Sequence, residues 1–342
     1  MKESPNLDVL RAIAVLSVYF AHLLATLKIH IPWDMGEFGV LIFFVHTSLV
    51  LMMSLERIQL AGRPLFTTFY VRRFFRIYPL SVLCVSFIVL FHLPRGPLGT
   101  WGPWSNPDLS TIIANLLLCM NLFQIHKVSL VAVLWSLPYE VEMYILLPFL
   151  FLAGKLYGFR GILVLLCAAV AIGVVQPHIA WRLDIAQYGP CFLAGVASYF
   201  LGFGVTRRRL PFLGWPVVIA TAAAMYACGS AIGVVAATRW IVCVWIGITA
   251  PFFDDLKWPA LRKSAAWVAK YSYGIYLTHL YAMWTAFDVL KNYAIWFRFL
   301  ALVALSIGLP ALLYHLVEFP MIKVGLQLSV PSKKRSLDVV LP

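Results

Sequence analysis

Three ionisable residues in the first apolar segment of the chain have types and spacing that could support chemistry. They are Asp8, Arg11 and His22, within LDVLRAIAVLSVYFAH. An α-helix turns about 100° per residue, so Arg11 and His22 fall within roughly 20° of one line, about 16 Å apart along the axis. Asp8 lies within about 40° of the same line. An acid, a base and an imidazole therefore share one helix face.

Ionisable side chains in an apolar segment are costly in lipid and are candidates for function by default. On the functional interpretation, His22 is a general base and Arg11 holds an anionic or polar group of a ligand. The alternative is a polar stripe whose hydrogen bonds only fix the packing of neighbouring helices. Packing does not need an ion pair and an imidazole aligned over about three turns, so we favour the functional interpretation.

A second candidate is the basic stretch RRFFRIYP, which begins at Arg72. Arg72 and Arg76 are one helical turn apart, and Arg73 is adjacent. Guanidinium groups bind phosphates with paired hydrogen bonds, so the cluster could hold a phosphorylated ligand. Its positive charges could equally serve only as a cytoplasmic topology anchor.

The stretch LWSLPYEVEMY contains a third set of polar residues. Pro138 suits the first turn of a helix, which places Ser136, Glu140 and Tyr144 one turn apart along a single side. The carboxylate of Glu140 could orient or charge-balance an imidazole on a neighbouring helix. Alternatively, Glu140 only complements the positive end of its own helix.

In SYGIYLTH, Ser272 and His279 are seven residues apart and share a helix face. An imidazole inside a membrane is often only a packing residue, so we treat this pair as supporting. Motifs for a catalytic serine elbow, a zinc protease, a Walker loop or a dinucleotide fold are absent from the sequence. The six cysteines lie singly in apolar runs and are typical of small core residues.

The composition indicates which elements must position these residues. Of the 342 residues, 62% are hydrophobic and only 12% are charged, with a mean hydropathy of +0.87. A soluble domain has no use for so much apolar surface, so the composition predicts an all-α, polytopic membrane protein. The net charge of +13 comes from basic residues at the ends of apolar segments. That pattern favours the positive-inside rule over a nucleic-acid partner.

Apolar segments of spanning length are separated by short polar connections, and a shorter one at 109–125 either crosses or only dips into the membrane. If 109–125 does not cross, most of the 27 basic residues fall on one side of the membrane. We therefore expect about ten transmembrane helices, both termini in the cytoplasm, and an outer loop at 94–108. The ten segments are 7–27, 37–55, 77–93, 131–153, 161–177, 187–204, 212–230, 232–250, 265–287 and 295–316.

Taken together, these motifs resemble the acyltransferase 3 family of membrane-bound O-acyltransferases, whose members acylate bacterial cell-surface glycans. The first segment is similar to that family's first helix and carries Arg11 and His22. RRFFRIYP, LWSLPYEVEMY and SYGIYLTH resemble later motifs, and VEFP resembles a Glu-x-Pro at the end of the last span. At 43–48 the chain reads FFVHTS where the family usually has Phe-Phe-Val-x-Ser-Gly. The resemblance covers essentially the whole chain, in order.

The resemblance implies a multi-pass enzyme of the bacterial inner membrane, with an acyltransferase 3 domain at 1–320. The polar, basic residues beyond Pro320 predict a loose cytoplasmic tail at 321–342. The co-substrate would be acyl-CoA, with acetyl as the expected group and without a bound cofactor or metal. The acceptor would be a hydroxyl of a cell-surface glycan or lipid-linked saccharide, in contact with membrane lipid and without nucleic acid.

The same resemblance implies roles for the candidate residues. Arg72, Arg73 and Arg76 would hold the phosphates of the donor at the inner mouth, and Arg11 would guide its pantetheine arm. His22 would take the proton of the acceptor hydroxyl, or transiently the acyl group itself, while Glu140 holds the imidazole in the required tautomer.

A rival hypothesis is a proton-coupled secondary transporter or flippase that uses Arg11, His22 and Glu140 as a proton relay. Such transporters are commonly built from two similar halves with broken helices at matching positions, and the sequence shows no such repeat. A purely structural scaffold would not need an intramembrane polar stripe. The sequence does not name the glycan or the oligomeric state.

Overall fold

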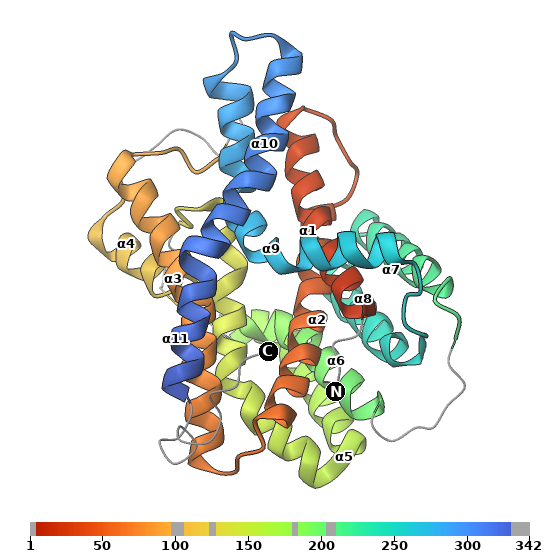
Figure 1. Ribbon diagram of the computed structural model, residues 1–342. Coiled ribbons are helices and arrows are strands. Elements are labelled where there is room, and N and C mark those ends of the chain that lie inside the picture. The colour runs from red at the N-terminus through yellow and green to blue at the C-terminus, as the bar shows by residue number, and fades with distance from the viewer. Residues whose placement is uncertain (1–4, 97–105, 123–127, 180–183, 203–209, 330–342) are drawn as a thin grey trace.

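The computed structural model describes residues 5–96, 106–122, 128–179, 184–202 and 210–329, and they form a bundle of helices (Figure 1). Each of the ten expected segments lies largely or wholly in a helix, and α5 contains two of them. The α-helices are α1 (Pro5–Thr26), α2 (Met35–Ile58), α3 (Arg63–Phe91), α4 (Leu109–Leu116), α5 (Leu137–Ile179), α6 (Ile185–Gly202), α7 (Gly214–Ala231), α8 (Val235–Thr249), α9 (Pro259–Trp284), α10 (Ile295–Leu313) and α11 (Phe319–Ser329).

Among the described residues, seven helical stretches are long and apolar enough to cross a membrane. One of the seven contains α5, which Gly158 divides into two helical halves with a backbone conformation of φ 66° and ψ −164°. A Cβ at Gly158 would meet no atom within 4 Å, so the backbone angle, rather than lack of space, requires glycine. Each half is about 20 residues long, enough for a hydrocarbon core of about 30 Å. The prediction of an all-α, multi-pass membrane protein is confirmed.

The segment at 109–125 begins with α4, whose N-terminus is capped by Asp108 through a 2.9 Å hydrogen bond from the Thr111 amide. The eight residues of α4 span about 12 Å, far less than the membrane core. Directly afterwards the backbone turns at Leu118, where φ is +54°. As described up to Leu122, this segment contains no helix of spanning length, and the expectation that 109–125 does not cross stays a prediction.

Helix α10 continues through one π-helical turn (Tyr314–Glu318) into α11, which runs beside α3 (Figure 1). The Thr68 hydroxyl of α3 donates a 3.1 Å hydrogen bond to the Ser329 carbonyl at the end of α11. The expectation of a loose segment directly after Pro320 is therefore wrong as far as Ser329, because α11 packs on α3. Residues 330–342 lie outside the described residues, so the division at 320 stays a prediction.

Helix α2 lies at the centre of the bundle and is buried along most of its length. Two glycines allow its neighbours to approach. A Cβ at Gly39 would lie 2.6 Å from the Ala14 carbonyl oxygen of α1, and a Cβ at Gly195 of α6 would lie 2.2 Å from the Val45 oxygen of α2. Small residues at such crossings let membrane helices pack backbone to backbone. This close packing holds α1 and α2 in a fixed register.

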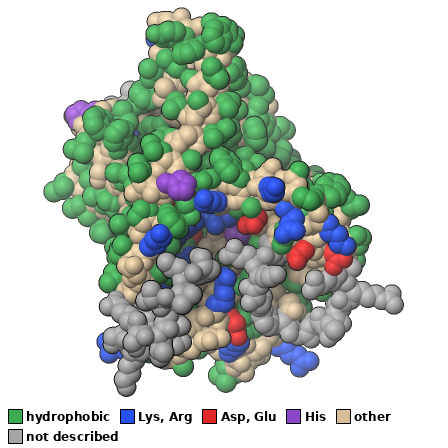
Figure 2. Space-filling model, in the orientation of Figure 1, with side chains coloured by type: hydrophobic (Ala, Val, Ile, Leu, Met, Phe, Trp, Pro, Cys, Tyr) green, Lys and Arg blue, Asp and Glu red, His purple; other side chains and the backbone are tan. Residues whose placement is uncertain are grey.

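Charged side chains are unevenly distributed over the surface. On the face in Figure 2, Lys, Arg, Asp and Glu gather in the lower half, while the upper half is almost entirely apolar. That distribution fits a protein whose basic connections lie on one side of a membrane. Residues 97–105 of the expected outer loop and the three arginines at 207–209 lie outside the described residues. The side on which the termini lie stays a prediction.

Candidate active site

A small cavity of about 60 Å³ between α1, α2, α3, α5 and α9 brings together five of the residues singled out from the sequence. These come from three separate motifs and lie far apart in the chain. The three-turn stripe of α1 contributes its arginine, the basic stretch of α3 contributes two, and the first turns of α5 contribute the acid and the tyrosine. The five residues are Arg11, Arg73, Arg76, Glu140 and Tyr144.

The charges around this cavity do not balance. Three guanidinium groups face two buried carboxylates, those of Glu140 and Glu318. The Arg76 Nη1 atom lies 2.6 Å from the Glu318 Oε1 atom, and the hydroxyl of Tyr144 donates a hydrogen bond to Glu140. Among the described residues, one positive charge of this cluster therefore has no counter-charge, which favours binding of an anionic or strongly polar group.

Several nitrogen atoms at the cavity are also unsatisfied. In the part of the chain that the structure describes, the Nε atoms of Arg11 and Arg73 and the Nδ1 atom of His46 are buried without a hydrogen-bond partner. The guanidinium of Arg11 lies 5.6 Å from the centre of the Phe43 ring, a cation–π contact. Buried polar atoms are normally paired, so these atoms are available to a ligand.

The second polar site is formed by two imidazole rings. His22 of α1 and His279 of α9 stack with their ring centres 5.2 Å apart and their planes at 29°. The Nδ1 atom of His279 is 2.9 Å from the Ile275 carbonyl, so this nitrogen carries the hydrogen and Nε2 keeps its lone pair. Nε2 is buried and has no partner among the described residues. His279 therefore presents an unoccupied proton acceptor beside His22.

Polar groups connect the level of the cavity with the level of the imidazoles. The Tyr276 hydroxyl donates a 2.6 Å hydrogen bond to the Val133 carbonyl and accepts one of 2.7 Å from Ser136. Its ring centre lies 6.4 Å from that of His279. Ser136 and Tyr276 also line a cavity of about 20 Å³, together with Glu140. The hydroxyls of Ser136 and Tyr276 thus lie between the Glu140 carboxylate and the His279 ring.

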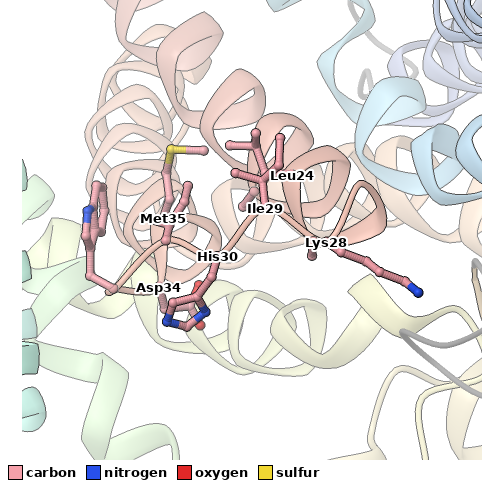
Figure 3. Close-up of a pocket in the computed structure, with 10 residues that line it drawn as sticks. Leu24, Lys28, Ile29, His30, Asp34 and Met35 are labelled. Atoms are coloured by element: carbon pink, nitrogen blue, oxygen red, sulfur yellow. The ribbon is translucent and has the colours of Figure 1, made fainter.

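A wider cavity of about 320 Å³ lies at the C-terminal end of α1, in the connection to α2. Figure 3 shows the His30 ring and the Asp34 carboxylate projecting on the same side, while Lys28 points away from them. Asp34 also caps α2 by accepting a 2.8 Å hydrogen bond from the Glu37 amide. This cavity borders the turns of α1 on either side of His22, at Ala21 and Ala25.

The structure separates some residues that the sequence analysis had grouped. Glu140 receives its hydrogen bond from Tyr144, and the ring stacked on His22 belongs to His279. The predicted contact between Glu140 and the His22 imidazole is therefore not formed. Arg72 points away from the cavity, and its Nε atom donates a 2.9 Å hydrogen bond to the Ser329 hydroxyl.

Two further predicted residues also lie away from the cavity lining. Asp8 is half-buried in the first turn of α1, where a carboxylate complements the positive end of the helix. Ser272 is fully buried beneath His279 on α9, but its hydroxyl donates to the Ala269 carbonyl at 2.8 Å.

Sequence reasoning missed three residues that the structure places at the cavity or next to it. His46, Tyr273 and Glu318 had been quoted only within motifs, yet His46 and Tyr273 line the cavity and Glu318 pairs with Arg76. For His46 and Glu318 the available signal was an ionisable side chain in a largely apolar stretch, whereas Tyr273 stands among other tyrosines and gave no such signal. Among the described residues, no group of three His, Cys, Asp or Glu side chains could hold a metal ion.

Comparison with known proteins provides the context for this geometry. No solved structure matches the chain at a significant level. The chain is 28% identical over 376 aligned positions to a protein of Bacillus subtilis (strain 168) named "Putative peptidoglycan O-acetyltransferase YrhL". That alignment covers 92% of this chain but 54% of the relative, so the chain spans about half the length of the relative. Residues 4–315 match the family described as "Acyltransferase domain". The chain therefore belongs to this family of acyltransferases, and it is a multi-pass membrane member.

Proposed function

We propose that the protein transfers an acetyl group from cytoplasmic acyl-CoA to a hydroxyl of a cell-surface glycan or lipid-linked saccharide, in the bacterial inner membrane. Family membership supports acyl transfer, and the name of the Bacillus relative supports a glycan acceptor and an acetyl group. The observation that carries the proposal is the arrangement along α1. A cation-rich cavity at Arg11 and an imidazole pair at His22 lie about 16 Å apart on one helix face.

Arg11, Arg73 and Arg76 are the proposed donor contacts. A cavity of about 60 Å³ admits only a narrow group, such as the pantetheine arm of the donor, whose thioester end would extend from there toward His22, and it is too small for a nucleotide. The Arg76 side chain is 21% exposed and so lies toward the rim, where phosphates can reach it. Arg72 is bound to Ser329 and contributes to the packing of α11 instead.

The reaction needs one proton acceptor near the acceptor hydroxyl. The hydroxyl oxygen attacks the thioester carbonyl carbon, a C–O bond forms, and the C–S bond breaks as the thiolate leaves. His22 takes the hydroxyl proton, which then passes to the thiolate. The unpartnered Nε2 atom of His279, buried against the His22 ring, is placed to accept a hydrogen bond from a second hydroxyl of the acceptor sugar. Transient acetylation of His22 itself is the alternative route.

The test compares surface glycans from three strains by mass spectrometry. The strains carry the intact protein, no protein, or the His22→Ala variant produced at the same membrane level. We expect acetyl groups on the glycan only with the intact protein. Equal acetylation in all three strains would overturn the proposed function. Purified protein supplied with labelled acetyl-CoA and vesicles separates acyl transfer from transport, because a transporter moves solute without consuming the thioester.

A further inference from the structure

A cavity of about 430 Å³ between α3, α9 and α10 takes no part in the site described above. Its lining is almost wholly apolar, and its volume lies in the range of small-molecule binding sites. Leu83 and Phe87 of α3 line it and are 40% and 51% exposed. In a membrane-spanning chain such exposed apolar side chains face lipid, so the cavity opens sideways into the bilayer.

One polar group in the cavity lacks a partner. The Tyr281 hydroxyl is buried without a hydrogen bond to any described residue. By contrast, the hydroxyls of Thr278 and Thr285, also in the lining, donate 2.8 Å hydrogen bonds to backbone carbonyls of α9. A buried hydroxyl left unpaired is destabilising, and an occupant with a hydrogen-bonding group would relieve that cost. The occupant is therefore mainly apolar but not purely hydrocarbon.

A positive charge lies at one end of this cavity. Leu93 belongs to the lining, and Arg95 follows it by two residues in the connection after α3. The guanidinium of Arg95 is held by a 3.0 Å hydrogen bond from Nε to the Ser129 carbonyl, and it interacts electrostatically with Tyr281. An apolar cavity with a cation at one end matches an amphiphile with an anionic head.

We propose that this cavity binds one membrane lipid whose phosphate headgroup carries a net negative charge. A hydrocarbon chain occupies the space between α3, α9 and α10, Arg95 pairs with the phosphate, and the Tyr281 hydroxyl donates to a headgroup oxygen. The proposal does not depend on acyl transfer, because none of its residues belongs to the donor cavity or the imidazole pair. A phospholipid and a polyprenyl phosphate share this chemistry.

The experiment measures lipids bound to the purified full-length chain in detergent by native mass spectrometry. Phosphatidylglycerol, phosphatidylcholine and a polyprenyl phosphate are added separately and in competition. We expect one anionic lipid per chain, with phosphatidylcholine at least about fivefold weaker. Leu309→Trp fills the cavity and should lower occupancy at least about tenfold. Its control is Leu312→Trp on the same helix, where Leu312 is 54% exposed and lies outside the lining.

Two milder variants keep the test decisive if the filled variant does not fold. Arg95→Gln should remove the preference for anionic lipid, whereas Lys291→Gln, a cation in the connection before α10, should not. Tyr281→Phe should weaken binding while leaving the fold intact. Displacement of phosphatidylglycerol by substoichiometric polyprenyl phosphate identifies a carrier-lipid site, and its retention identifies a phospholipid site. Binding of phosphatidylcholine as tight as that of phosphatidylglycerol, or unchanged occupancy in folded Leu309→Trp, would overturn the proposal.

Discussion

Two buried clusters of arginine and glutamate lie in this bundle, and they differ in whether their charges are satisfied. In the first, between α2, α6, α7 and α8, Arg239 Nη2 lies 2.6 Å from Glu37 Oε1. The Tyr188 hydroxyl donates to the same carboxylate at 3.2 Å, and the Tyr226 hydroxyl donates to its other oxygen. One cation faces one anion, and the Arg239 guanidinium also lies over the Tyr188 ring.

The second cluster is the cavity at Arg11. There, three cations face two anions and open space remains. An unpartnered Nε atom does not distinguish the two clusters, because Arg11, Arg73 and Arg239 each have one among the described residues. A buried ion pair with its lone pairs occupied has nothing left to offer a ligand, whereas surplus charge beside a cavity does. The comparison teaches that an intramembrane charge marks a site when it is left unbalanced, not simply when it is buried.

The largest effect should come from His22, the imidazole connected to the unbalanced cluster along α1. His22→Ala removes the proton acceptor, and loss of a general base costs about 10²–10⁴ in rate. We expect acetyl transfer to vanish while membrane level and thermal stability stay near wild type. His22→Gln should fail equally, because an amide cannot take the proton, and His315→Ala serves as the control. Substantial activity in the Gln variant would move the base to His279 or Glu140.

Arg239→Met tests the balanced cluster. It leaves the Glu37 carboxylate buried without its counter-charge, which should lower the free energy of unfolding by about 3–5 kcal/mol. Transfer activity per folded molecule should not change. Adding Glu37→Gln to the same chain should restore most of the stability. Thermal unfolding in detergent, read beside specific activity, checks both; an unchanged melting temperature with lost activity would make this cluster a functional site.

Arg73→Gln tests the unbalanced cluster and has a matched control in the next residue. Arg73 faces the donor cavity, so we expect acyl-CoA binding to weaken by about 1.5–3 kcal/mol, the contribution of a hydrogen bond to a charged group. Arg72→Gln should leave affinity unchanged, because Arg72 bonds to Ser329. Calorimetric titration of purified protein with acyl-CoA measures both. Wild-type affinity for acyl-CoA in both variants would show that the basic stretch is only a topology anchor.

Arg76 requires a compensated variant. Arg76→Gln alone leaves Glu318 buried and unpaired, so a loss of binding in that variant would mix stability with recognition. The double variant Arg76→Gln/Glu318→Gln removes the pair together and should fold normally with weaker acyl-CoA binding. If the double variant binds acyl-CoA as tightly as the wild type, the role of Arg76 is to pair with Glu318 and not to bind the donor.

The smallest effect should come from Tyr188→Phe in the balanced cluster. Its hydroxyl is one of three donors to Glu37 and lies at 3.2 Å, so its loss should lower the free energy of unfolding by only about 1 kcal/mol. Transfer should stay at the wild-type level. A loss of several kcal/mol would show that the carboxylate depends on this one hydroxyl, contrary to the satisfied state inferred here.

The sequence by itself determined the class of fold and the general region of the site. The chain has ten apolar segments of spanning length, with basic residues at their ends. Inside lipid, these segments can satisfy their own backbone polar groups only as helices. Likewise, helix periodicity alone places Arg11 and His22 on one face of α1, since those two residues share one rigid element. The membership in an acyltransferase family also followed from the order of the motifs.

Only the tertiary structure decided which residues meet. Periodicity carries no information about which face of α5 meets which face of α1. The contact expected between Glu140 and His22 came from the family resemblance, whereas the packing places His279 against that imidazole. Periodicity also could not separate Arg72 from Arg73, because adjacent residues differ by about 100° around a helix and the neighbours decide which one points inward. In the structure α11 occupies the face at Arg72, and the cavity lies at the face of Arg73.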